Sequence, residues 1–67
     1  MPGDEFGIKL KAARLSKTIN GKVVSQEAAA RLFLSSLAAY RSWEKSRRLP
    51  MAIYRAKIAE HWPEVFS

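Results

Sequence analysis

The sequence predicts a small all-α domain of four to five helices, with room for a short β-hairpin between the first and second helices. Three observations support this fold class: apolar residues recur at helical spacing, serine and proline mark helix ends, and one Asn-Gly pair interrupts the pattern. The 67 residues form one domain, residues 1–67. A chain of this size buries only about 60% of its unfolded surface, so its core must be small.

The first helix is expected to be capped by Asp4 or a neighbour and to run to about Lys17. Gly7 interrupts it and costs the helix about 1 kcal/mol relative to alanine. One side of the helix carries apolar residues and an arginine at helical spacing: Phe6, Leu10, Ala13 and Arg14. This side should pack on the rest of the chain.

The connection to the second helix contains the strongest turn signal of the sequence. Asn20-Gly21 separates two short extended runs, and both residues tolerate the positive φ that a two-residue hairpin turn needs. We expect a small hairpin or tight loop that covers the core. The alternatives are a wing that touches phosphate through Lys22, or a dimer contact through Ile19 and Val23.

Two serines mark the starts of the second and third helices. Ser25 is followed by Gln, Glu and three alanines, which is typical of an N-cap with an acidic first turn. The helix that it opens should end within residues 32–34. Ser36, with the serine before it, provides the next N-cap, and a helix should run from Leu37 to about Lys45.

The third helix has two different faces. Ala39, Tyr40 and Trp43 form a stripe that can pack inward, so we assign the tryptophan to the core. The opposite stripe has small residues at its start, polar or basic residues beyond and no acid: Leu37, Ala38, Arg41, Ser42 and Lys45. Such a surface can enter a DNA major groove without charge repulsion.

Pro50 is expected to start the last main helix, from Met51 to about His61, because proline is accepted in the first helical turn. Its apolar residues at helical spacing should complete the core: Ile53, Tyr54 and Ile58.

A short tail follows Trp62-Pro63, where the proline ends the helix. Trp62 and Phe66 form a second aromatic group in it. The tail either folds back on the core or pairs with a second copy, and we expect a role in dimerisation.

The chain has a formal charge of +6, and a local excess of five positive charges lies between Arg41 and Lys57. Between Arg41 and Lys57 lie six basic residues and one acid, Glu44. Phosphate backbones favour such clusters because binding releases counterions. This charge pattern favours nucleic acid as a partner, against the alternative of a basic surface that is merely solvated.

Composition argues against several other classes of protein. Without cysteine the chain has no disulfide or thiolate metal site, and His61 alone cannot hold a metal. No apolar run approaches the roughly 18 residues of a membrane span, and no signal peptide is visible, so we expect a cytoplasmic protein. Paired carboxylates, a Ser–His–Asp set and a Gly-rich phosphate loop are missing. We therefore expect no enzyme, no cofactor and no small-molecule ligand.

One set of residues is typical of a known family in its order and spacing: Ser25-Gln26-Glu27, Ala30, Phe33 and the run Trp43-Glu44-Lys45-Ser46-Arg47-Arg48-Leu49-Pro50. On the basis of this set, the segment 8–61 resembles the lambda-repressor-like, Cro-type (XRE) helix-turn-helix family of DNA-binding regulators. The resemblance implies that the third helix is the recognition helix. Leu34 stands where the family usually has glycine, which predicts a turn of different shape or one shifted by a residue.

The resemblance also implies an ion pair. The family often pairs an arginine of the first helix with the glutamate after the tryptophan, and Arg14 and Glu44 match those positions. Such a pair would fix the relative orientation of two helices. The alternative is two unrelated surface charges.

The residues expected to read DNA sequence lie on the third helix. Arg41 is the first choice, because a bidentate guanidinium on guanine O6 and N7 is the commonest specific contact. Ser42 is a secondary reader, and Leu37 and Ala38 suit thymine methyl groups. The alternatives are that Arg41 contacts phosphate only and that Leu37 belongs to the core.

The residues expected to hold the DNA backbone surround that helix. Gln26, as its counterpart does in the family, should reach a phosphate or a base edge. Ser36 can hold a phosphate at a helix N-terminus, Lys45 should reach phosphate, and Arg47 and Arg48 should grip the backbone from the following loop.

The resemblance implies a function as well as a fold. Such domains generally bind as two-fold dimers to inverted repeats in double-stranded DNA, with recognition helices about 34 Å apart. We expect a homodimeric repressor of phage, plasmid or toxin–antitoxin type that acts by occupying a promoter. The alternative is an antitoxin or adaptor whose aromatic C-terminal surface binds another protein.

Overall fold

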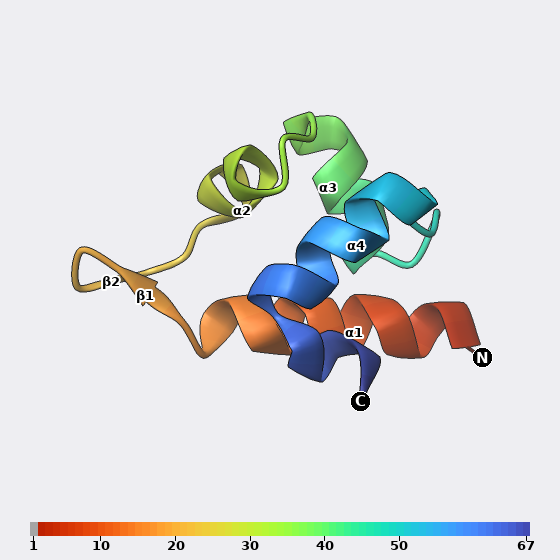
Figure 1. Cartoon of the computed structure of the whole chain (residues 1–67), viewed down its shortest axis with the longest axis horizontal. Coiled ribbons are helices and arrows are strands. Elements are labelled where there is room, and N and C mark those ends of the chain that lie inside the picture. The colour runs from red at the N-terminus through yellow and green to blue at the C-terminus, as the bar shows by residue number, and fades with distance from the viewer. Residues whose placement is uncertain (1) are drawn as a thin grey trace.

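The computed structural model describes the backbone of residues 2–67 and the side chains of residues 5–67. Four α-helices, one short 3-10 helix and one two-stranded hairpin make up this part of the chain: α1 (Pro2–Leu15), β1 (Thr18–Ile19), β2 (Lys22–Val23), α2 (Gln26–Leu32), α3 (Leu37–Glu44), α4 (Ala52–His61) and η1 (Pro63–Phe66). The mostly helical architecture with a hairpin between α1 and α2 is the one predicted. In Figure 1, α1 lies below α2, α3 and α4, and the hairpin projects at one end.

The helix α1 begins earlier than expected, at Pro2, a residue that suits the first helical turn. Asp4 therefore lies inside the helix, and its prediction as the cap is wrong. The helix also ends at Leu15 rather than near Lys17, because the chain turns into β1 at Thr18.

The hairpin has the turn that Asn-Gly predicts. Asn20 has φ 54° and Gly21 has φ 80°, and the strands pair antiparallel in the register Thr18↔Val23. All six residues of the strands and turn are exposed. The prediction that this segment covers the core is wrong, because its two-residue strands point away from the helices (Figure 1), and only the following residue, Val24, is buried.

The predicted serine caps open α2 and α3. Ser25 Oγ accepts a hydrogen bond from the Ala28 amide at 3.0 Å, and Ser36 Oγ accepts one from the Ala39 amide at 3.1 Å. Each cap satisfies a backbone donor that the first helical turn leaves without a partner.

The turn between α2 and α3 places a leucine in a backbone conformation that favours glycine. Leu34 adopts φ 59°, the left-handed conformation, and is 71% exposed. The Ser35 amide bonds the Ala30 carbonyl at 2.9 Å and the Leu34 amide bonds the Arg31 carbonyl at 3.1 Å, the two hydrogen bonds of a Schellman motif. These hydrogen bonds hold a leucine in a conformation that favours glycine, and a change of turn shape or register relative to the family stays a prediction.

Side chains from every helix meet in one core. Its buried apolar residues are Leu10, Ala13, Val24, Ala29, Ala30, Phe33, Tyr40, Trp43, Ile58, Trp62 and Val65. Phe33 and Trp62 pack edge to face with ring centroids 4.8 Å apart, which joins the end of α2 to the tail.

The helix α4 begins at Ala52 with Met51 as its N-cap, so Pro50 precedes the helix instead of starting it. Ile58 is fully buried and Tyr54 packs against the core, as predicted. Ile53 is 61% exposed, and its prediction as a core residue is wrong because it lies on the outward side of the first turn.

The tail folds back on its own chain. Trp62 and Val65 are each 3% exposed, and Phe66 packs on Phe6 with ring centroids 5.8 Å apart. An ion pair of 2.6 Å between Lys17 Nζ and Glu64 Oε2 ties η1 to the end of α1. The structure thus shows a tail that folds back on the core, and a role of the tail in dimerisation stays a prediction.

Candidate nucleic-acid interface

The two faces of α3 separate as the sequence predicts. Tyr40 and Trp43 are buried in the core, at 0% and 4% exposure. The residues of the opposite stripe lie at the surface: Leu37, Ala38, Arg41 and Lys45 are exposed and Ser42 is half-buried. The alternative that Leu37 belongs to the core is wrong, since 37% of its surface is open to solvent. We refer to these five residues as the α3 stripe.

Two hydroxyl groups of this region bond to the helix itself. Ser36 Oγ accepts from the Ala39 amide, which leaves its own hydrogen free to donate to a ligand. Ser42 Oγ donates to the Ala38 carbonyl at 3.1 Å, so its hydrogen is in use and its lone pairs remain free.

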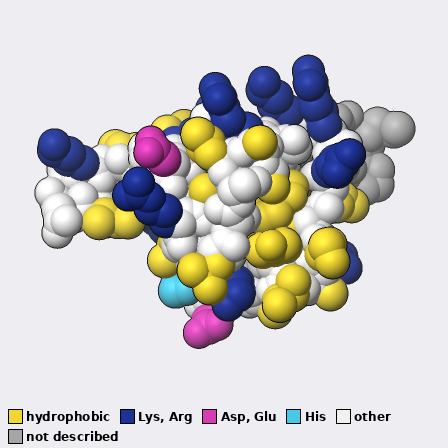
Figure 2. Space-filling model, turned by 90° about the horizontal axis from the view of Figure 1, so that it is seen from above, with side chains coloured by type: hydrophobic (Ala, Val, Ile, Leu, Met, Phe, Trp, Pro, Cys, Tyr) yellow, Lys and Arg dark blue, Asp and Glu magenta, His cyan; other side chains and the backbone are white. Residues whose placement is uncertain are grey.

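Basic side chains continue the stripe beyond the C-terminus of α3. Arg47 and Arg48 are exposed in the loop that leads to α4. In the part of the chain with described side chains, the ion pairs involve Arg14, Lys17 and Arg31, so the basic residues of the stripe and loop have no carboxylate partner there. Figure 2 shows Lys and Arg side chains gathered along one edge of this face, with hydrophobic side chains beside them.

The one acid of this region is removed from the surface. The side chain of Glu44 is 4% exposed, and its Oε2 lies 2.6 Å from Nε of Arg14. A second hydrogen bond of 3.2 Å joins Arg14 Nη2 to Glu44 Oε1, and Arg14 Nη1 donates to the Val24 carbonyl at 2.9 Å. The predicted pair is confirmed. Because the guanidinium neutralises the carboxylate inside the fold, the α3 stripe faces solvent without negative charge.

The pKa of Glu44 is held below its ordinary value. Burial alone would raise it, but hydrogen bonds from Arg14 and Gln26 to the carboxylate, together with the polar Tyr40 hydroxyl beside it, outweigh burial. Burial also raises the pKa of Tyr40, with the Glu44 carboxylate as the second cause. Within the described part of the chain, the Tyr40 hydroxyl has no partner in hydrogen-bond geometry. The Arg14–Glu44 pair therefore stays charged over the neutral range, beside a phenol that stays protonated.

Gln26 joins this network from the first turn of α2. Its Nε2 donates to Glu44 Oε1 at 3.0 Å, and the side chain is half-buried. The amide is thus held in one orientation by the same carboxylate that bonds Arg14. A contact from Gln26 to DNA stays a prediction, and the second amide hydrogen is the donor that it would use.

Gly7 supports the interface in a way that sequence reasoning missed. A Cβ atom at this position would come within 2.5 Å of the Glu44 carbonyl oxygen and would also overlap Ser46 Oγ. The backbone of α1 therefore touches the C-terminal end of α3 directly. That end closes with Ser46 at φ 59°, and the Arg47 amide bonds the Ser42 carbonyl at 3.0 Å.

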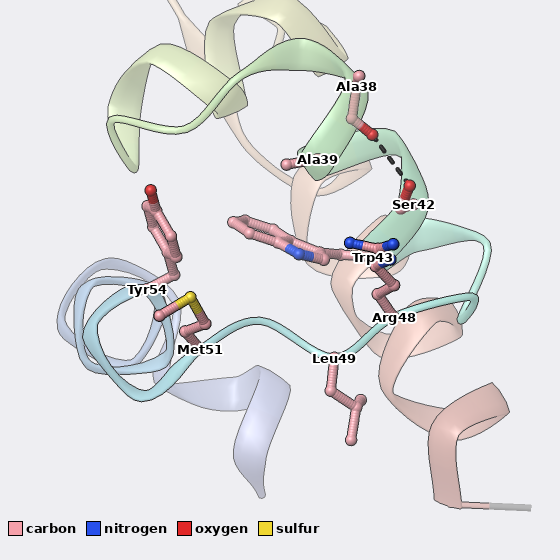
Figure 3. Close-up of a pocket in the computed structure, with 8 residues that line it drawn as sticks. All are labelled: Ala38, Ala39, Ser42, Trp43, Arg48, Leu49, Met51 and Tyr54. Atoms are coloured by element: carbon pink, nitrogen blue, oxygen red, sulfur yellow. Dashed lines mark hydrogen bonds between the residues drawn. The ribbon is translucent and has the colours of Figure 1, made fainter.

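An open groove lies beside the α3 stripe, between α3 and the start of α4 (Figure 3). Its volume is about 350 Å³, and it is lined by Ala38, Ala39, Ser42, Trp43, Arg48, Leu49, Met51 and Tyr54. Trp43 and Tyr54 form its floor with ring centroids 5.3 Å apart. This groove was not predicted from the sequence. The signal for it was two apolar residues, Leu49 and Met51, in the loop that follows Arg47 and Arg48.

Comparison of the chain with protein-family models, with curated proteins and with solved structures finds no match. Within the described residues, no cluster of three or more possible metal ligands occurs. None of the described helices combines the length and apolarity needed to cross a bilayer.

Proposed function

We propose that this chain is a sequence-specific double-stranded DNA-binding transcriptional regulator of the lambda-repressor-like helix-turn-helix type. The observation that carries the proposal is the α3 stripe, an exposed helix face without acid that is followed by two exposed arginines. A helix of this kind fits a DNA major groove, and the flanking arginines suit its phosphates. The buried Arg14–Glu44 pair supports the proposal because it removes the one carboxylate of α3 from the surface that would face DNA.

In this proposal the residues divide into readers and positioners. Arg41 reads a base, with Ser42 as a secondary reader. Leu37 and Ala38 at the start of α3 approach thymine methyl groups. Backbone phosphates are held by Gln26, Ser36, Lys45, Arg47 and Arg48.

The proposal includes a homodimer on an inverted repeat, which acts as a repressor by occupying a promoter. One copy offers few phosphate contacts, so it would bind weakly and lose affinity steeply with salt. Ile19 and Val23 of the projecting hairpin, at 45% and 55% exposure, lie on opposite faces of the two strands, and each is an apolar side chain that a second copy can cover. Sedimentation equilibrium should show a dimer that Ile19→Ser with Val23→Ser dissociates, whereas a monomeric parent chain would contradict this assignment.

The decisive experiment is a selection of binding sites from random duplex DNA at stated salt, followed by amide-shift mapping with the selected duplex. We expect an inverted repeat to be selected and the largest shifts at Leu37, Ala38 and Arg41. A selection that yields no consensus, or a duplex that leaves these amides unchanged, would sink the proposal.

A further inference from the structure

The groove beside α3 is the feature that DNA binding does not account for. It shares Ala38 and Ser42 with the α3 stripe, but its other lining residues come from the inner side of α3, the loop and α4. At its rim Leu49 is 57% exposed and Met51 is 70% exposed. Exposed apolar side chains gathered at a hollow mark an interaction site more often than a free surface.

The chemistry of the lining indicates one apolar anchor in the occupant. The floor is formed by the rings of Trp43 and Tyr54, and the walls by small or flexible side chains such as Ala38 and Met51. In Figure 3, the side chains of Trp43, Tyr54 and Met51 surround the hollow, while Arg48 lies at its edge. A methionine adapts its shape to an inserted side chain, and aromatic rings provide contact area for it.

The charge around the groove indicates which charge the remaining residues of the occupant carry. Arg48 lines the groove, and Arg41, Lys45, Arg47 and Arg55 are exposed on the same or adjoining segments. From residue 37 to residue 59 the only acid is Glu44, which is buried. The complement of an apolar hollow with a basic rim is an acidic segment that carries an apolar anchor.

A second copy of this chain fits the rim less well. The chain carries a net charge of +6, and a two-fold contact through this groove would bring Arg48 and its basic neighbours against their own copies. Like charges placed across an interface oppose association.

We propose that the groove binds an acidic segment of a partner protein, with a large apolar side chain inserted over Trp43 and Tyr54. The inference rests on the proposed function for its consequence: because the segment covers Ala38 and Ser42, it and DNA exclude each other. The partner would then act as an antagonist of the regulator.

The test uses the full chain and a synthetic helical peptide of 14 residues, with two leucines and one phenylalanine on one face and glutamate elsewhere. Two matched peptides carry lysine for glutamate, or alanine for the three apolar residues. We expect the acidic peptide to bind at least about ten-fold more tightly than either control, and to shift the amides of Ala38, Leu49 and Met51. Leu49→Ser with Met51→Ser should weaken it about ten-fold, while Ile8→Ser, which alters an apolar side chain 67% exposed on α1, should not.

The proposal would be overturned if the lysine peptide bound as tightly as the acidic one, if the shifts were confined to other surfaces, or if the acidic peptide did not bind at all. Self-association of the parent chain that Met51→Ser abolishes would assign the groove to a second copy and likewise overturn it.

A second experiment, with DNA present, distinguishes failure of this proposal from failure of the proposed function on which it rests. Peptide binding is measured without DNA, so it supports the groove even where the selection from random duplex yields no consensus. Where a duplex is selected, the acidic peptide should displace it in fluorescence anisotropy and the alanine peptide should not. A ternary complex of chain, duplex and acidic peptide would overturn the antagonism.

Discussion

Arg14 of α1 and Glu44 of α3, 30 residues apart in sequence, meet in a two-point contact with Nε–Oε2 at 2.6 Å and Nη2–Oε1 at 3.2 Å. Both side chains are almost completely buried, at 10% and 4% exposure. The planar guanidinium fixes the rotation of α1 against α3, and its third donor bonds the carbonyl of Val24 just before α2. One side chain thereby sets the positions of three helices.

Breaking this pair should strongly destabilise the fold, because removing either group leaves the other as a buried charge without a partner. We expect Arg14→Met and Glu44→Leu each to lower the free energy of unfolding by about 3–5 kcal/mol. The double variant should cost much less than the sum of the two. Urea unfolding of the four chains measures the coupling, and additive effects would show that the pair has no mutual energy.

The same carboxylate predicts how stability depends on pH. The pKa of Glu44 is lower in the fold than in the unfolded chain, so its contribution is complete above the ordinary carboxyl pKa. This contribution is lost as pH falls through the lowered value. We expect the free energy of unfolding to decline below about pH 4.5 and the decline to be shallower in Glu44→Gln.

The control for this pH dependence is Glu64. Its pKa is also lowered, by a hydrogen bond from Lys17, but its side chain is 45% exposed. Glu64→Gln should therefore leave the decline in the free energy of unfolding at acid pH nearly unchanged. An equal flattening in both variants would contradict the role given to burial.

Gly7→Ala should destabilise the chain although alanine is the better helix former. The added Cβ would overlap the Glu44 carbonyl and force α1 away from α3. We expect a loss of about 1–3 kcal/mol in thermal or urea unfolding. The control is Ala12→Gly at an exposed position of α1, which should cost about 1 kcal/mol from helix propensity alone. A stabilised Gly7→Ala would show that the close approach is absent in solution.

Leu34→Gly should stabilise the chain by about 1 kcal/mol, because it relieves a leucine from the left-handed conformation at a site where little burial is lost. Leu34→Ala is the matched control, since alanine keeps the strain and removes the same side chain. A gain of equal size in both variants would trace the effect to the exposed leucine side chain and not to the backbone.

Arg41→Ala should relax the preference at one base-pair position of the selected DNA site. Arg47→Ala should weaken binding to all sequences about equally and reduce the salt dependence by about one phosphate contact. Lys11→Ala, a matched loss of charge on the exposed side of α1, should do neither. An unchanged sequence preference in Arg41→Ala would remove this residue from the readers.

The elements with local signals were predicted from the sequence. Ser25 and Ser36 cap helices by short hydrogen bonds within one turn, and Asn20-Gly21 adopts the positive φ values that it tolerates better than other residues. The inward stripe of α3 follows from helical spacing alone. Such features depend on a few neighbouring residues, so the sequence is sufficient to predict them.

Apart from the ends of α1 and α4, the errors concern relationships between distant segments. The glycine at position 7 reads as a weak helix residue until the carbonyl of Glu44 is placed next to it. Ile53 and Trp62 are both large and apolar, but Trp62 is buried where the tail folds back, while Ile53 faces outward at the start of α4. The groove between α3 and α4 likewise exists only once the loop with Leu49 and Met51 has been placed.

The projecting hairpin has a practical consequence for the chain's tolerance of change. Residues 18–23 contribute nothing to the buried interior, and the segment leaves and rejoins the helices at nearby points, Lys17 and Val24, whose backbones are hydrogen-bonded at 3.2 Å. Each doubling of such a connection costs only about 0.6 kcal/mol in closure entropy. This tip is therefore where a reporter sequence can be inserted, or homologous chains can differ in length, while the helices keep their arrangement.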